Sequence, residues 1–274
     1  MSEKKPPIAG IITAGYTPGE DDPLADHTSG RPKAMLPVGG RSMIAYVIDA
    51  LAGSRHVQEI AIVGLPEEYH ASLPPFLQHV PDRGGLLANA EAGMEYAYAH
   101  MSSAGGVLIS SSDLPLVTPA VVDRFIDDCL ETEHDVYYSI IERSVMEARF
   151  PSSRRTYVRL KDGQFAGGDM FFVRSKPNVD KQELWERVTN ARKHPLKQVR
   201  LLGGIVPLVR LVTRQMSLAE AEERASRIVG LRGRAVICAD AEIGMDVDKP
   251  IQLDIARAEL ESNASKPRSN PPHP

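Results

Sequence analysis

Three short segments carry the residue types that nucleotide chemistry needs, and the first lies near the start of the chain. The apolar run IAGIITAG, residues 8–15, ends in Ala14-Gly15, and a polar loop then leads to RPKAMLPVGG, residues 31–40. Because Ala14 and Gly15 have little or no side chain, a base or a phosphate can approach their backbone closely. Lys33 adds a positive charge that can neutralise a polyphosphate, and the loop can present N–H groups to an anion. The alternative interpretation is a surface loop with one exposed lysine.

The segment GGVLISSSDLPLVTP, residues 105–119, supplies a carboxylate directly after an apolar strand-like run. Open α/β sheets bind their ligands at the carboxyl ends of parallel strands, and that is where Asp113 would lie. A carboxylate in that crevice can hold Mg²⁺. The alternative role for Asp113 is to cap the turn that Leu114-Pro115 forms.

The segment AEIGMDVDKPIQL, residues 241–253, offers a second carboxylate. Asp246 and Asp248 alternate, so in an extended segment they share one face, and either can reach the same metal ion as Asp113. Pro250 is expected to start the closing helix. The alternative interpretation is that these acids only complement the positive end of that helix.

These residues need a scaffold, and strand-like and helical patterns alternate through the first half of the chain. The expected strands are residues 8–13, 57–63, 106–110 and 136–141, and the expected helices are residues 42–51, 86–101 and 118–130. Thr118 and Pro119 read as the N-cap and first position of the last of these helices. The order favours a Rossmann-like α/β fold, a mostly parallel sheet with helices on both faces.

The second half of the chain does not follow this alternation of strands and helices. Two strands, residues 156–160 and 165–173, flank a Lys-Asp-Gly turn and are expected beside the main sheet as an antiparallel extension. Helices are expected over residues 180–192, 195–227 and 250–261, with a strand at residues 234–238. We expect one domain over residues 1–262, with a nucleotide-binding half (8–140) and an acceptor half (150–262), and a disordered Pro-rich tail over residues 263–274.

Composition excludes several classes of function. A formal net charge of -4 and a pI of about 6.1 do not suit a nucleic-acid or membrane surface as a main partner. No apolar run approaches the roughly 20 residues of a membrane helix, and the N-terminus lacks the pattern of a secretory signal. Cys129 and Cys238 are far apart and fall in core-like patterns, so both are expected to be reduced. The expected location is the cytoplasm.

Taken together, the three segments resemble the MobA-like branch of the NTP transferase (nucleotidyltransferase) superfamily, which is GT-A-like. Residues 13–15 with 31–40 resemble its opening signature. Residues 112–119, SDLPLVTP, resemble its Asp-x-Pro-Leu-x-Thr/Ser segment, and residues 245–254, MDVDKPIQLD, resemble its closing Val-Asn/Asp-Thr-Pro-x-Asp-Leu segment. The resemblance covers about residues 8–140 and 234–260. The order Val247-Asp248-Lys249-Pro250 matches its Val-Asn/Asp-Thr-Pro order.

The resemblance implies a Mg²⁺-dependent enzyme that transfers a nucleoside monophosphate from an NTP to an acceptor and releases pyrophosphate. It places Lys33 and Asp113 as catalytic residues and Asp113 with Asp248 as the metal-binding pair. The nucleotide-binding residues that it implies are Ala14, Gly15, Lys33, Gly85 and Asn89, the last two from GGLLANAEAGM, residues 84–94. The compact loop of the family is stretched here to about residues 15–31 and carries four acidic residues. Arg31 is the candidate for the family arginine, and guanine specificity does not carry over.

Residues 150–230 lie outside the family signatures and are expected to form the acceptor side. The segments RRTYVRL (154–160), AGGD (166–169) and ARKHPLK (191–197) supply the candidates. Gly168 would give a ligand access, Asp169 follows it on a strand, and Arg192 and Lys193 suit an anionic acceptor. The alternative for the basic cluster is a solvated helix face.

The function hypothesis is therefore a Mg²⁺-dependent nucleotidyltransferase whose partners are an NTP and a small, anionic acceptor, without nucleic acid or membrane. Two alternatives stay open at this point. A GT-A-type glycosyltransferase would use a nucleotide sugar, although a triphosphate needs Lys33 more than a diphosphate-sugar does. A non-catalytic nucleotide-binding protein would keep the fold, and the acidic stretched loop favours it. The sequence leaves open the NTP base, the acceptor and the oligomeric state.

Overall fold

The computed structural model describes residues 6–15, 23–103, 105–174 and 215–264. Its centre is an eight-stranded sheet with the strand order β10-β7-β9-β6-β1-β4-β5, in which β8 pairs with β9. The run IAGIIT forms β1, and all six of its residues are buried, as expected for a central parallel strand covered on both faces. The strands are β1 (Ile8–Thr13), β4 (Val57–Val63), β5 (Gln78–Val80), β6 (Gly106–Ser111), β7 (Val136–Glu142), β8 (Val158–Leu160), β9 (Gly163–Val173) and β10 (Gly233–Cys238).

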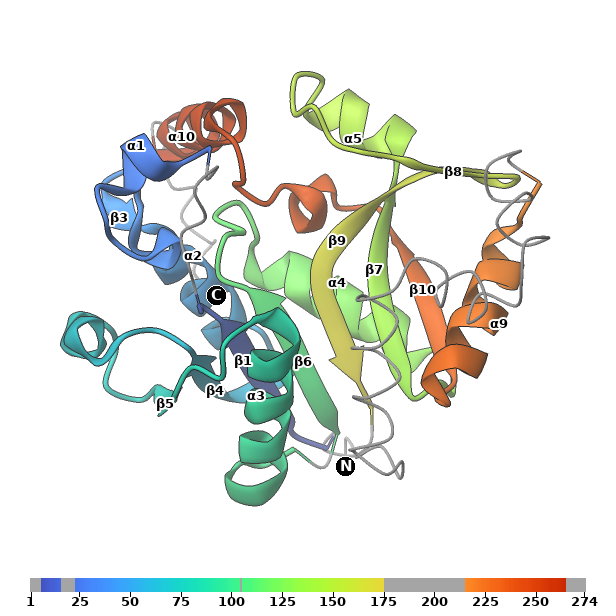
Figure 1. Cartoon of the computed structure of the whole chain (residues 1–274), viewed down its shortest axis with the longest axis horizontal. Coiled ribbons are helices and arrows are strands. Elements are labelled where there is room, and N and C mark those ends of the chain that lie inside the picture. The colour runs from blue at the N-terminus through green and yellow to red at the C-terminus, as the bar shows by residue number, and fades with distance from the viewer. Residues whose placement is uncertain (1–5, 16–22, 104, 175–214, 265–274) are drawn as a thin grey trace, which may run out of the picture.

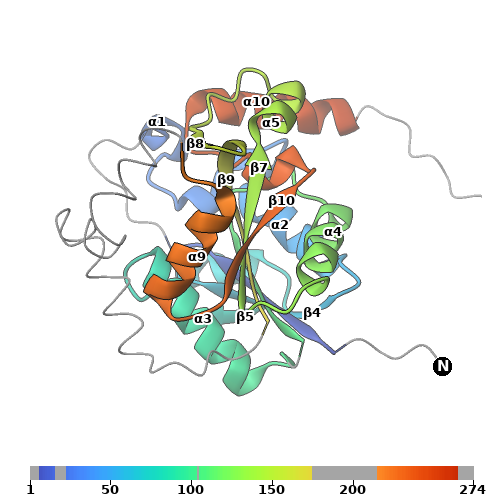
Figure 2. The ribbon, with the colours of Figure 1, turned by 90° about the vertical axis from the view of Figure 1, so that its right-hand side faces the viewer.

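Helices cover both faces of this sheet (Figures 1 and 2). α2 (Met43–Ala52) and α4 (Pro119–Leu130) pack on one face and belong to the larger apolar core. α3 (Leu86–His100) lies on the opposite face over β1, β4 and β6, where a second apolar core forms. α9 (Leu218–Val229) contacts β10. The sequence-predicted fold class, a Rossmann-like mostly parallel α/β sheet, is confirmed.

The carboxyl ends of the parallel strands point to the upper edge of the sheet in Figure 1. Helix α10 (Pro250–Ala264) and helix α5 (Arg143–Arg149) lie at this edge. Shorter elements complete the described fold: α1 (Ala25–Thr28), η1 (Lys33–Met35), η2 (Glu67–Ser72), η3 (Ala241–Gly244) and the two-stranded sheet of β2 (Pro37–Val38) and β3 (Arg41–Ser42). Among the helices of the described residues, none has both the length and the apolar character that crossing a bilayer requires.

Local signals explain most element boundaries. Thr118 caps α4 by accepting a hydrogen bond from the Val121 N–H, and Pro119 occupies the first helical turn, as predicted. Cys129 and Cys238 are buried free cysteines, as the sequence indicated. Helix α10 runs to Ala264, three residues beyond the predicted end and into the predicted tail. The helix expected over residues 180–192 and most of that over 195–227 lie outside the described residues.

Strand β9 occupies a different place from the one expected. It lies inside the sheet, antiparallel to both β6 and β7, and only the short β8 extends from it. The register between β7 and β9 shifts near Ser139. There the Ser139 side chain takes the place of backbone hydrogen bonds between the two strands. Its hydroxyl accepts a hydrogen bond from the Met170 N–H (3.2 Å) and donates one to the Met170 carbonyl (2.8 Å). Strand β9 therefore lies within the sheet, between β7 and β6, instead of flanking it.

Gly168 on β9 is required by this packing. A Cβ at Gly168 would lie 2.8 Å from Cγ2 of Ile243 and closer still to Oγ of Ser139, both of which are buried. Because protein interiors are close-packed, neither side chain can move away from such a Cβ without lowering the stability of the fold.

We predict that Gly168→Ala lowers the free energy of unfolding by about 1–3 kcal/mol through overpacking. Gly233→Ala on β10 is the matched control, since its Cβ would meet no atom nearer than 3.5 Å, and its effect should stay within about 0.5 kcal/mol. Urea unfolding of both variants measures the difference. Equal stability of the two variants would show that Ser139 and Ile243 do not confine this position.

Candidate active site

A cavity of about 860 Å³ opens at the carboxyl edge of the sheet. Strands β1, β6 and β9, the start of α3 and the segment before α10 all contribute to its walls. Most of the described residues that the sequence singled out for binding or catalysis line it: Ala14, Gly15, Lys33, Asn89, Asp113, Asp169 and Asp248. The topology therefore brings together residues that are up to 234 positions apart.

Lys33 joins the two predicted metal-binding carboxylates. Its Nζ lies 2.6 Å from Oδ2 of Asp113 and also pairs with Oδ1 of Asp248. The Lys33 and Asp113 side chains are 18% and 11% exposed, whereas that of Asp248 is 57% exposed and open to a ligand. Burial disfavours the ammonium form of Lys33, but the charges of Asp113 and Asp248 outweigh it and raise the pKa of Lys33. Lys33 is thus a permanent cation between two carboxylates.

The Asp113 carboxylate is held from its own strand as well. The Ser111 hydroxyl, at the end of β6, donates to Oδ1 of Asp113. The Asp113 carbonyl accepts from the Val247 N–H at 3.0 Å, which ties the turn after β6 to the segment that carries Asp248. One side chain and one backbone contact therefore fix Asp113 relative to its partner.

Backbone close packing shapes the turn after β1. The Ala14 N–H donates to the Val63 carbonyl at 2.8 Å, and Gly15 follows with an exposed backbone. A Cβ at Gly64, whose φ is +87°, would lie 2.8 Å from the Gly15 nitrogen, so a glycine also follows strand β4. A Cβ at Gly15 would in turn meet the Asn89 amide and lie 2.8 Å from Oδ1 of Asp82. The turn offers bare backbone to a flat or anionic ligand.

Asn89 and Asp82 form the wall beside this turn. Asn89 Nδ2 donates to Asp82 Oδ1 at 2.7 Å, and Asn89 Oδ1 accepts from the Arg83 N–H at 2.7 Å. Asn89 is buried, so its amide acts mainly as a brace. Asp82 is exposed and was missed by sequence reasoning, because an acid in a Pro-Asp-Arg-Gly-Gly loop gives no signal of its own.

Two further carboxylates lie beside Asp113. Asp169, from β9, lines the cavity, and Asp246 is hydrogen-bonded to both Asp169 and Asp248. Burial and the charge of Asp113 raise the pKa of Asp169, and burial with the charges of Asp169 and Asp113 raises that of Asp246. Arg155 pairs with Asp246, and both side chains are largely buried.

The donor set fits a divalent cation. Two cations pair with these acidic side chains, Lys33 with Asp113 and Asp248, and Arg155 with Asp246. Two positive charges thus face four acidic residues, and among the described residues no cation is ion-paired with Asp169. Among the described residues, no three His, Cys, Asp or Glu side chains form a complete metal cage. Mg²⁺ does not need one, because it binds to one or two carboxylates and takes its other ligands from water and substrate phosphates. Asp113 and the exposed Asp248 are the carboxylates suited to it.

Three of the predicted site residues that the structure describes stand apart from this arrangement. Gly168 is buried under Ser139 and Ile243, so its small size serves packing and not ligand access. Arg31 and Gly85 are exposed and do not line the cavity, although Gly85 directly precedes helix α3. Arg192 and Lys193 lie outside the described residues, so their acceptor role stays a prediction.

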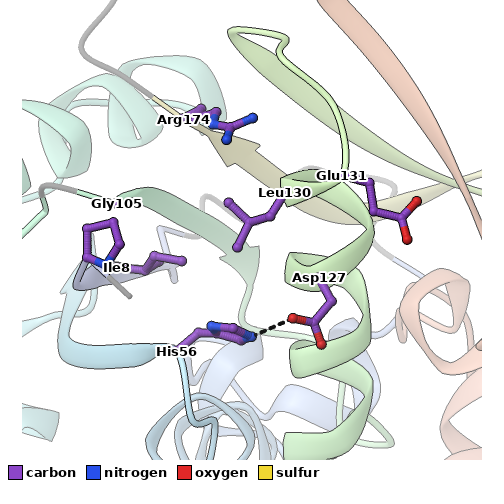
Figure 3. A pocket seen from close by; sticks show the side chains of 8 residues that line it. Ile8, His56, Gly105, Asp127, Leu130, Glu131 and Arg174 are labelled. Atoms are coloured by element: carbon purple, nitrogen blue, oxygen red, sulfur yellow. Dashed lines mark hydrogen bonds and ion pairs between the residues drawn. The ribbon is translucent and has the colours of Figure 1, made fainter. Parts of the chain in front are cut away.

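A second cavity, of about 470 Å³, lies at the opposite edge of the sheet, near the start of β1. Figure 3 shows His56 pointing toward Asp127 of α4, with Nε2 of His56 3.0 Å from an oxygen of Asp127. Ser54 and the Arg55 N–H both bind Asp123 one turn earlier on α4. These contacts anchor α4, and no residue that the sequence singled out lines this cavity.

Comparison with known proteins agrees with this geometry. Residues 28–176, more than half of the chain, match the family model of the MobA-like NTP transferase domain. A solved structure from Thermus thermophilus, titled a hypothetical transferase, is 35% identical with a TM-score of 0.76 and covers 90% of this chain and 99% of its own. The chain therefore belongs to the MobA-like NTP transferase family, a class of nucleotidyltransferases.

More distant relatives share the fold or part of the sequence. The molybdenum cofactor guanylyltransferase of Rhodopseudomonas palustris is 28% identical over 137 residues, which are 50% of this chain and 60% of that protein. The match to the enzyme of the same name from Bradyrhizobium covers 47% of this chain and 58% of that protein. The chain thus matches about three fifths of the length of these relatives. A CMP:2-keto-3-deoxy-manno-octonic acid synthetase complexed with CTP has the same fold, with 15% identity and a TM-score of 0.58 over 94% of this chain and 99% of its own.

The paired carboxylates give a pH prediction for the metal-free protein. Asp169 and Asp246 have raised pKa values in the folded state, so the folded chain holds more protons than the unfolded chain above about pH 4. As the pH rises toward neutrality, Asp246 ionises in the unfolded chain but keeps its proton in the folded chain, so this residue lowers the free energy of unfolding over that range. Relative to the wild type, Asp246→Asn should gain stability as the pH rises from about 4 to 7. Urea unfolding in a chelator at several pH values measures this, and a stability difference that does not change with pH would contradict it.

Proposed function

We propose that the protein is a Mg²⁺-dependent nucleotidyltransferase that moves a nucleoside monophosphate from an NTP to a small, anionic acceptor and releases pyrophosphate. The observation that carries the proposal is the bridge of Lys33 Nζ to Asp113 and Asp248 at the mouth of the cavity. Family membership supports the class of reaction, and the names of the relatives include guanylyltransferases and a CTP-bound synthetase. These names do not determine which nucleobase the NTP of this protein carries or which molecule accepts the nucleotide.

The residues of the cavity divide between the two substrates. The bare backbone of Ala14 and Gly15, with the Asn89 amide behind it, suits the nucleoside and its first phosphate. Asp169 lies on the other side of Asp113, on β9, and faces the space that an acceptor would take. An acceptor that attacks through a phosphate or carboxylate oxygen needs no general base, which agrees with an anionic acceptor.

The transfer itself relies on alignment and charge. An acceptor oxygen attacks the α-phosphorus, the bond between the α-phosphorus and its bridging oxygen breaks, and the electron pair leaves with pyrophosphate. Lys33, as a permanent ammonium, stabilises the negative charge that develops on the α-phosphate and the leaving group. Asp113 and Asp248 would hold Mg²⁺, which supplies charge neutralisation and orientation of the phosphates.

The carboxylate pair can be tested directly. Asp113→Asn and Asp248→Asn should each lower the rate of pyrophosphate release at least about a hundredfold, because both remove a negative ligand of the cation. Asp246→Asn should be milder, since Asp246 acts through its neighbours. The matched control is Asp254→Asn, an exposed acid on α10. Full Mg²⁺-dependent turnover in Asp113→Asn, with a folded far-UV spectrum, would overturn the assignment.

The phosphate role of Lys33 gives a separate test. Lys33→Ala should weaken the binding of Mg·NTP about ten- to a hundredfold, the range expected for a lost hydrogen bond to a charged group. Lys33→Arg should restore only part of it, because the planar guanidinium differs in shape and reach from a compact ammonium. Calorimetry with each of the four NTPs, with Lys161→Ala as the control, measures the effect. Unchanged affinity and turnover in Lys33→Ala would remove the phosphate role.

A further inference from the structure

Lys249 lines the cavity, yet the transfer described above gives it no role. It lies between Asp248 and Pro250, directly before helix α10. It lines the same cavity as Lys33 and Asp113, and the residue is exposed. This chain has therefore placed an additional cation at the mouth of its candidate active site.

The backbone of Lys249 is held in a fixed place. Oε1 of Gln252 accepts from the Lys249 N–H at 2.8 Å and from the Asp248 N–H at 2.9 Å. Gln252 is itself only 2% exposed, so it acts as a rigid brace. The same short segment is tied to Asp113 through the Val247 N–H and to Lys33 through the Asp248 carboxylate. Lys249 thus projects from a segment anchored on three sides.

The charge of Lys249 has no counterion among the described residues. Lys33 is already paired with Asp113 and Asp248, and Arg155 is paired with Asp246. Within the part of the chain that the structure describes, no carboxylate lies within ion-pair distance of Nζ of Lys249. A lysine at the start of α10 also meets the positive end of the helix dipole, which works against stability. An anion in the cavity would offset both costs.

We propose that Lys249 binds the β- and γ-phosphates of the NTP and stabilises their negative charge as they are released as pyrophosphate. The proposal rests on the proposed nucleotidyl transfer. Asp169 lies on β9, whereas Lys249 lies directly before α10, next to the carboxylate that pairs with Lys33 of η1. Because Lys249 directly follows a carboxylate that would hold Mg²⁺ on the phosphates, its ammonium would stabilise the charge that develops on the leaving pyrophosphate.

The test uses Mg·pyrophosphate and the full-length chain. Lys249→Ser should weaken the affinity for Mg·pyrophosphate about tenfold and raise the KM for NTP, because one charge-assisted hydrogen bond is lost at an exposed site. Its melting temperature should stay the same or rise, since the cation leaves the positive end of α10. Lys249→Arg should retain most of the affinity. Lys161→Ser, which removes an exposed lysine from the β8–β9 turn, is the matched control and should bind as the wild type does.

The outcomes separate this inference from the proposed function. If the wild type binds Mg·NTP and Lys249→Ser binds Mg·pyrophosphate equally well, the inference is overturned and the proposed function stands. A change confined to the KM of the acceptor would also overturn it, because the lysine would then serve the other substrate. If the wild type binds neither NTP nor pyrophosphate, both proposals fail. Weaker pyrophosphate binding in Lys249→Ser, with Lys161→Ser unchanged, supports the inference.

Discussion

The candidate site depends on one interaction, the ammonium of Lys33 held between the carboxylates of Asp113 and Asp248. Lys33 and Asp113 are 80 positions apart in the sequence, and Lys33 and Asp248 are 215 apart. Without the lysine, two carboxylates at this spacing would repel each other. Partial burial makes the ammonium costly on its own, so each partner compensates for the other. The same three groups that stabilise one another are those that a triphosphate and a divalent cation would engage.

The sheet topology creates this meeting point. β1 and β6 are neighbouring parallel strands, so Gly15 and Asp113 leave the sheet at the same edge. β9, inserted antiparallel between β6 and β7, brings Asp169 to that edge from the opposite chain direction. The segment before α10 closes the arrangement, because the Val247 N–H bonds to the Asp113 carbonyl. Each wall of the cavity thus comes from an element whose position follows from strand order.

Local sequence patterns were sufficient to predict much of this fold. The short apolar runs of β1, β4, β6 and β7 are typical of buried strands. The start of α4 was predictable because Thr118 can cap a helix and Pro119 suits its first turn. The convergence of Lys33, Asp113 and Asp248 was expected from strand ends and from the family resemblance. Their roles in binding and catalysis remain predictions. Asp169 was expected on a strand near the crevice, and it lies there.

Other features depend on contacts that no local pattern reveals. The place of β9 between β6 and β7 is decided by long-range pairing, which leaves no periodic signal in residues 163–173. Gly168 looked like an access point, but its size is explained by Ser139 on a neighbouring strand. Arg155 pairs with Asp246, which lies 91 positions later in the sequence. One arginine among several in the segment RRTYVRL does not indicate which acid it will pair with.

The most direct measurement is a crystal structure of the chain with Mg²⁺ and a non-hydrolysable NTP. We expect the α-phosphate within hydrogen-bond distance of Lys33 Nζ, the cation on Asp113 and Asp248, and the nucleoside against the backbone of Ala14 and Gly15. A nucleotide seated elsewhere, for example in the cavity beside His56 and Asp127, with Lys33 still paired only to its two carboxylates, would contradict it.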